Sequence, residues 1–120
     1  MDIKSITPTS RVTFELDGKD ASVTFDVAFV APDQLGDYVT ANAADNRLSA
    51  LVRKVLIDAV GGWDLTEDGV PIPCTAETKA KYLPIIFGLV IKTEAENPFD
   101  KVLGRALLNY AMEPGNFLKN

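Results

Sequence analysis

The sequence predicts an α+β domain in which an N-terminal β-hairpin packs on a bundle of four to five α-helices. Within residues 11–30, apolar and polar residues alternate with period two on both sides of a glycine-containing loop, which is typical of a half-buried hairpin. Later segments combine helix-start residues with apolar residues at three- and four-residue spacing, as amphipathic helices do. A chain of 120 residues has the size of one domain, so we expect a single domain.

The hairpin is expected over residues 11–30. Apolar side chains alternate with polar ones from Val12 to Leu16, and the alternation resumes from Ala21 to Phe29. Because two strands alone are marginal in water, the helices that follow should cover the apolar face. Residues 1–10 show little periodicity and are expected to form a loose arm, and residues 32–120 are expected to be mainly helical.

Two helices are expected before the centre of the chain. A weak one should begin at Pro32 or Asp33 and run to about residue 44, because proline suits a first helical turn. A stronger one is expected over residues 47–60, where apolar residues follow helical spacing. The pair Gly61-Gly62 should end it with a positive φ.

The C-terminal half is expected to continue as helices. Thr75 should cap a helix that Pro84 breaks or kinks. The apolar run 85–92 is either a core helix or a strand, because short apolar runs are ambiguous. Asn97 should cap a last helix over residues 98–112, and residues 116–120 are expected to fray.

Charge and composition argue against several classes of partner. The net charge of −5 and a pI near 4.6 disfavour nucleic-acid binding. The longest apolar run, residues 83–91, is far shorter than the about 20 residues of a membrane span. The first residues lack the pattern of a secretory signal. We therefore expect a cytoplasmic protein that binds neither nucleic acid nor membrane.

The residues offer little for catalysis. Histidine is absent, which removes Ser-His-Asp and Cys-His nucleophiles and histidine-ligated metals. The single cysteine, Cys74, is interpreted as a small apolar side chain. Neither acidic cluster fits the spacing of a calcium loop; the clusters are Asp17 with Asp20, and Asp64 with Glu67 and Asp68. We expect no enzyme, cofactor or metal, and a small carboxylate- or lysine-dependent enzyme is the least favoured alternative.

Residues 61–73 separate the two halves of the chain and contain its only tryptophan. Asp68-Gly69 should form a tight turn, and Pro71 and Pro73 should keep the backbone extended. We interpret Trp63 as a core anchor, and the alternative is a hot spot on a protein-binding surface. The same choice applies to the other candidate protein-interaction residues, Phe87, Ile91, Phe99 and Leu108. Core is the better interpretation for each one, but we expect some of these apolar groups to contact a partner or another copy.

The central motif resembles that of tail assembly chaperones of long-tailed bacteriophages. The resemblance covers about residues 48–78, although the family usually has a longer acidic insert after the tryptophan and an aromatic residue at the position of Cys74. The matching residues are Val60, Gly62, Trp63, Asp68, Gly69, Pro71, Pro73 and Thr75.

The resemblance implies a function in tail assembly inside the bacterial host cell. Such a protein coats the tape measure protein, keeps it soluble and associates with itself. A longer form made by ribosomal frameshifting recruits tail tube subunits, and the codons of residues 118–120 could contain the slippery run. The alternative is a phage or bacterial adaptor that docks one fixed protein partner.

Overall fold

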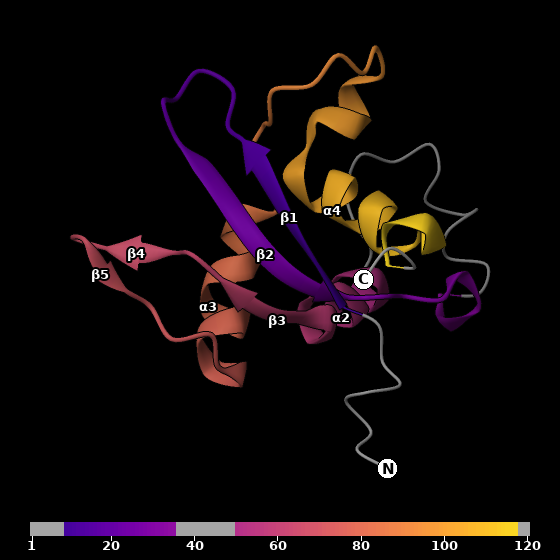
Figure 1. Ribbon diagram of the computed structural model, residues 1–120, viewed down its shortest axis with the longest axis horizontal. Coiled ribbons are helices and arrows are strands. Elements are labelled where there is room, and N and C mark those ends of the chain that lie inside the picture. Colours follow the sequence, from indigo (N-terminus) through magenta and orange to yellow (C-terminus); the bar gives the residue numbers. More distant parts are fainter. Residues whose placement is uncertain (1–8, 36–49, 118–120) are drawn as a thin grey trace.

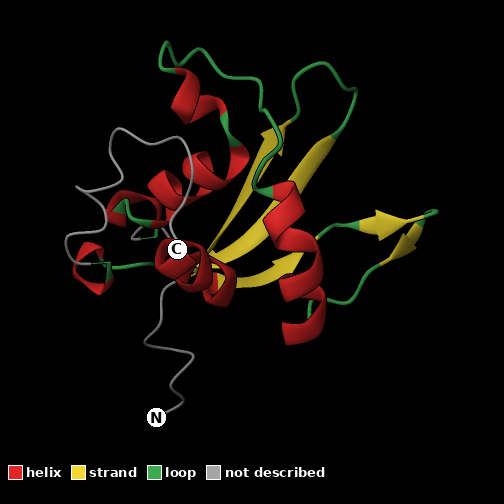
Figure 2. Cartoon of the chain, turned by 180° about the vertical axis from the view of Figure 1, so that it is seen from behind, coloured by secondary structure: helices red, strands yellow, loops and turns green. Residues whose placement is uncertain are grey.

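The computed structural model describes residues 9–35 and 50–117 and shows an α+β fold (Figure 1). Within these residues there are three α-helices and five strands in two small sheets. The α+β class is therefore right, but the bundle of four to five α-helices is wrong. The helices are α2 (Ala50–Ala59), α3 (Ala76–Ile86) and α4 (Leu103–Ala111). They lie around a twisted sheet (Figure 2).

The larger sheet contains the expected hairpin and one strand that was not expected. Strands β1 (Thr9–Glu15) and β2 (Ser22–Ala28) pair antiparallel with Val12 opposite Phe25. The hairpin prediction is confirmed, but Thr9 and Ser10 belong to β1 and not to a loose arm. Strand β3 (Val60–Trp63) adds antiparallel to β2, which gives the order β1-β2-β3.

The glycine pair after α2 is part of β3 and does not form a helix stop. Helix α2 ends at Ala59 and the chain enters β3 at once. Among the described glycines, only Gly18 and Gly69 have a positive φ. The expected left-handed stop at Gly61-Gly62 is therefore wrong. The β2–β3 register shifts between Asp26 and Val27, so Gly61 is the extra residue of a bulge.

Helix α3 begins where the sequence predicts and ends later. The Oγ1 of Thr75 accepts a hydrogen bond from the Thr78 amide at 3.2 Å, and the Oγ1 of Thr78 accepts one from the Thr75 amide at 2.9 Å. The helix continues through Pro84 to Ile86, so the expected break is wrong. Proline removes one hydrogen bond, to the carbonyl of Ala80. Both residues are exposed, so water can bind that carbonyl.

The segment after α3 is built from short pieces. Val90 forms an isolated bridge with Val102, and Ile91 forms one with Leu16. The run 85–92 is thus neither one helix nor one strand of its own.

The expected C-terminal helix is also divided. A 3₁₀ helix (Pro98–Lys101) is followed by an extended Val102 and then by α4. Near the start of the chain, a 3₁₀ helix (Pro32–Gln34) stands at the beginning of the expected weak helix. The rest of that prediction, from residue 36, lies outside the described residues.

The core lies between the sheet and the helices. The side chains with no more than 1% exposure come from β2, from β3 and from all three α-helices, together with Leu35. Phe117 is also buried, with its ring 5.5 Å from that of Phe29 and 6.0 Å from that of Tyr110. Fraying from residue 116 is therefore wrong at Phe117, and residues 118–120 lie outside the description. None of the described helices is both long and apolar enough to cross a lipid bilayer.

Replacing the cap of α3 tests the start of this helix. We expect Thr75→Ala to lower the free energy of unfolding by about 1 kcal/mol, because the Thr78 amide loses its acceptor. The matched control, Thr75→Ser, keeps an acceptor oxygen and should unfold close to wild type. Urea denaturation followed by circular dichroism measures both. Equal midpoints for the two variants would show that the cap contributes nothing.

Candidate functional site

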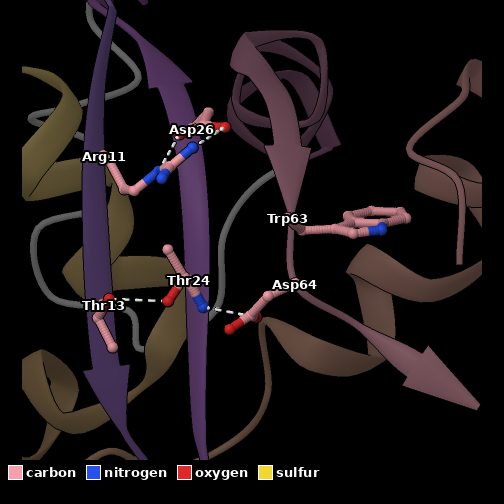
Figure 3. Close-up of a pocket in the computed structure, with 6 residues that line it drawn as sticks. All are labelled: Arg11, Thr13, Thr24, Asp26, Trp63 and Asp64. Carbon is pink, nitrogen blue, oxygen red and sulfur yellow. Dashed lines mark hydrogen bonds and ion pairs between the residues drawn. The ribbon is translucent and has the colours of Figure 1, made fainter. Parts of the chain in front are cut away.

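A hollow lies on the polar face of the larger sheet, where β1, β2 and the end of β3 meet (Figure 3). It has a volume of about 390 Å³. Alternation along β1 and β2 places the side chains that these two strands contribute on the face opposite the core. The lining residues are Arg11, Thr13, Thr24, Asp26, Trp63 and Asp64.

Arg11 and Asp26 form an ion pair across the two strands. The Nε of Arg11 donates to Oδ1 of Asp26 at 2.8 Å, and a terminal guanidinium nitrogen donates to Oδ2 at 3.3 Å. The hydrogen bond and the charge of Asp26 raise the pKa of the Arg11 guanidinium above its ordinary value. Both side chains are exposed, so the pair adds little to stability. Its effect is to fix the position of the carboxylate.

Gly62 provides the space in which this carboxylate lies. Asp26 is opposite Gly62 in the sheet, and a Cβ built on Gly62 would lie 2.7 Å from Oδ2 of Asp26. A Cβ on Gly61 would have its nearest neighbour at 3.9 Å, which is ordinary contact. Gly62 is therefore explained by a side chain on the adjacent strand, not by its own backbone conformation.

Asp64 extends the pairing of β2 beyond the end of β3. Its Oδ1 accepts a hydrogen bond from the Thr24 amide at 2.8 Å, and its own amide donates to the Thr24 carbonyl at 3.2 Å. The hydroxyls of Thr13 and Thr24 are 2.7 Å apart and share a hydrogen bond. The polar groups of the hollow are thus bonded mainly to one another.

Trp63 points away from the polar groups of the hollow (Figure 3). Its ring packs against the core, and its Nε1 donates to the carbonyl of Ile72 at 2.7 Å. The amide of Ile72 in turn donates to the carbonyl of Leu65 at 2.9 Å. The core-anchor interpretation therefore fits Trp63, which fastens the base of the second, smaller sheet.

That sheet is a short hairpin which we call the β4–β5 arm (residues 66–71). It consists of β4 (Thr66–Glu67) and β5 (Val70–Pro71). Asp68 and Gly69 have φ values of 52° and 80°, as a type I′ hairpin turn requires. The expected tight turn is confirmed. All six residues are exposed, and the arm projects from the body of the molecule (Figure 1).

The remaining predicted interaction residues lie elsewhere. Phe87, Ile91 and Leu108 are buried in the core, with 3–6% exposure. Phe99 belongs to the 3₁₀ helix Pro98–Lys101, and its side chain lies outside the description. The structure therefore does not bring Phe87, Ile91 and Leu108 together with Trp63 into one exposed surface.

The large apolar side chains that are exposed within residues 9–35 and 50–117 were not among the candidates. They are Leu51, Val70, Ile85 and Val90. Four residues of the polar hollow were also missed, although the outward positions of the predicted hairpin could have indicated them: Arg11, Thr13, Thr24 and Asp26.

The acidic cluster of the sequence is divided by the fold. Asp64 bonds to β2, whereas Glu67 and Asp68 stand on the arm. No group of three or more potential metal ligands occurs among residues 9–35 and 50–117. Burial raises the pKa of the Cys74 thiol, and the charge of Lys79 offsets part of that increase. The thiol therefore carries less thiolate than usual at neutral pH.

Comparison of the chain with protein-family models, with curated proteins and with solved structures gave no match.

The space above Gly62 can be tested with its neighbour as control. We expect Gly61→Ala to be neutral or slightly stabilising, because alanine reduces the freedom of the unfolded chain. Gly62→Ala should be about 1 kcal/mol or more less stable than Gly61→Ala, because the new methyl displaces the Asp26 carboxylate. In an Asp26→Ala background this difference should disappear. If Gly62→Ala remains less stable than Gly61→Ala in that background, the loss of stability has a cause other than contact with Asp26.

The anchor at the base of the arm gives a local prediction. Trp63→Phe keeps an aromatic ring but removes the donor to the Ile72 carbonyl, so we expect a loss of about 1 kcal/mol in stability. Amide hydrogen exchange of Ile72 should accelerate by more than that of Leu56 in the core, because the change frees the arm first. Equal acceleration at both amides would contradict the anchoring role.

Proposed function

We propose that this protein is a phage tail assembly chaperone that coats the tape measure protein and helps to recruit tail tube subunits. The proposed site of action is the cytoplasm of the bacterial host. The function is non-catalytic binding, in which several weak apolar contacts hold many copies along one long client. The proposal rests on the motif between residues 48 and 78 and on the exposed apolar side chains.

The observation that carries the proposal is the placement of these apolar side chains. Ile85 is 71% exposed and Val90 is 47% exposed, on either side of the turn that follows α3. Leu51 lies on α2 and Val70 on the arm. Exposed apolar groups on separate elements suit a protein that masks an apolar polymer and is later displaced. A single deep pocket would suit a fixed partner better.

The residues of the motif also have structural roles, which explain how the segment between α2 and α3 is built. Gly62 accommodates Asp26, Trp63 anchors the segment after β3, and Asp68-Gly69 turns the arm. Thr75 then starts α3. The motif thus builds a short strand, a projecting arm and a capped helix in succession. This arrangement supports a binding function for the segment.

Co-expression with the tape measure protein encoded downstream tests the proposal. We expect the client to be soluble only in the presence of this chain, with several copies bound to each client. The variant Ile85→Ser/Val90→Ser should lose most of this solubilising effect, because two apolar contacts are removed. The matched control, Glu94→Ser/Glu96→Ser, changes two exposed polar residues of a nearby loop and should solubilise the client like wild type.

The outcome is read by sedimentation of the lysate and by light scattering of the purified complex. A client that stays insoluble with the wild-type chain would exclude the chaperone function. A soluble complex with one copy of each protein would favour the adaptor alternative.

A further inference from the structure

A groove between α2 and α3 is lined in part by apolar residues. The two helices contact each other, and the groove between them has a volume of about 360 Å³. Its shape follows from small side chains, since alanine leaves space where helices pack side by side. The apolar lining residues are Ala50, Ile57, Ala76 and Ala80.

The charged residues of the groove are mainly basic. Lys54, Arg53 and Lys79 line it together with one carboxylate, Asp58. Lys79 donates from Nζ to the carbonyl of Val60 at 2.9 Å, which holds its charge at the groove. Lys54 is exposed and makes no ion pair within residues 9–35 and 50–117. Its ammonium group can therefore meet an acidic partner.

The β4–β5 arm has the opposite character. Val70 is 65% exposed, and the neighbouring Glu67 and Asp68 carry carboxylates. No lysine or arginine occurs between Asp64 and Pro71. The type I′ turn and the hydrogen bond from Trp63 to Ile72 constrain the arm at its tip and its base, which lowers the freedom lost when it binds.

We propose that the arm of one copy docks into the α2–α3 groove of a second copy. Val70 packs against the alanine residues of the groove, and the carboxylate of Glu67 lies toward Lys54. The partner is a second copy because the chain itself supplies both surfaces. The arm combines an apolar side chain with carboxylates, and the groove combines apolar side chains with lysine and arginine. Charge complementarity of this kind selects partners and orientation.

The contact joins different surfaces of the two copies. In the structure the arm is exposed and directed away from α2 (Figure 1), so it does not occupy the groove of its own chain. Each added copy therefore presents a new arm and a new groove. A heterologous contact of this type builds an open row of copies unless the rotation closes a ring. The inference rests on the proposed function, in which many copies bind along one client, and identifies the surfaces that join neighbouring copies.

The experiment is sedimentation of the full chain alone, without client. The average mass of the wild type should rise with protein concentration between about 10 μM and about 1 mM, the range of weak contacts. It should fall when salt is raised, because about 1 M salt shortens the Debye length to about 3 Å. Val70→Ser should raise the dissociation constant about tenfold or more. Lys54→Glu should raise it too.

A mixture of the two variants is the sharpest test. Lys54→Glu keeps an intact arm and Val70→Ser keeps an intact groove, so one good contact can form between them. We expect the mixture to stop at a dimer under conditions in which each variant alone is monomeric. Ile85→Ser is the matched control, because it removes an equally exposed apolar side chain outside the groove and the arm. It should associate like wild type.

Several results would overturn the proposal. One is a wild type that stays monomeric over the whole concentration range. Another is a mixture of Lys54→Glu and Val70→Ser that forms no dimer, or an Ile85→Ser variant that loses association while Val70→Ser keeps it. If the wild type is monomeric and Lys54→Glu fails to solubilise the client, the groove binds the client and not a second copy. Client solubility thus reports on the proposed function separately from the contact between copies.

Discussion

The pairing of β3 with β2 is the interaction on which the described structure depends. Strand β2 lies between β1 and β3, and its inward side chains Val23, Phe25 and Val27 are buried. Without β3, the hairpin would be a two-stranded ribbon, which is marginal in water. With β3, the sheet gains a third strand, and the chain before and after β3 is fixed at the same time.

This pairing positions both surfaces of the proposed contact between copies. Helix α2 runs directly into Val60 at the start of β3, and Trp63 at its end anchors the arm. The groove beside α2 and the arm after β3 are therefore held by the same four-residue strand. The cation of Lys79 is bound to the carbonyl of Val60, which links α3 to this strand as well. A change in β3 would alter the arm and the groove together.

The elements that could be predicted from the sequence are those with strong local patterns. The hairpin follows from period-two alternation, the start of α3 from Thr75, and the arm turn from Asp68-Gly69. Strand β3 could not be predicted, because Val-Gly-Gly-Trp is short and its glycines disfavour strands. The reason for Gly62 lies in the side chain of Asp26 on another strand. Such a contact is invisible until the strands are paired.

The candidate surface was harder to predict than the fold. Ile85 and Ile91 have the same chemistry and lie close in sequence, yet Ile85 is 71% exposed and Ile91 only 6%. The difference arises because Ile91 bridges to Leu16 at the end of the hairpin, which is a long-range contact. Local periodicity cannot report such a contact. In the polar hollow, only the contribution of Trp63 and Asp64 depends on such a contact, since both reach the hairpin through the pairing of β3.

The closure of the core by the C-terminal segment has a consequence for synthesis on the ribosome. The inner face of the hairpin is made first, but α4 and Phe117 cover part of it, and Tyr110 bonds to Ser10. At about 5–20 residues per second, roughly 100 residues take about 5–20 s to emerge. During that time the nascent hairpin has an apolar face without its cover, so that this small protein is itself open to misassociation before it is complete.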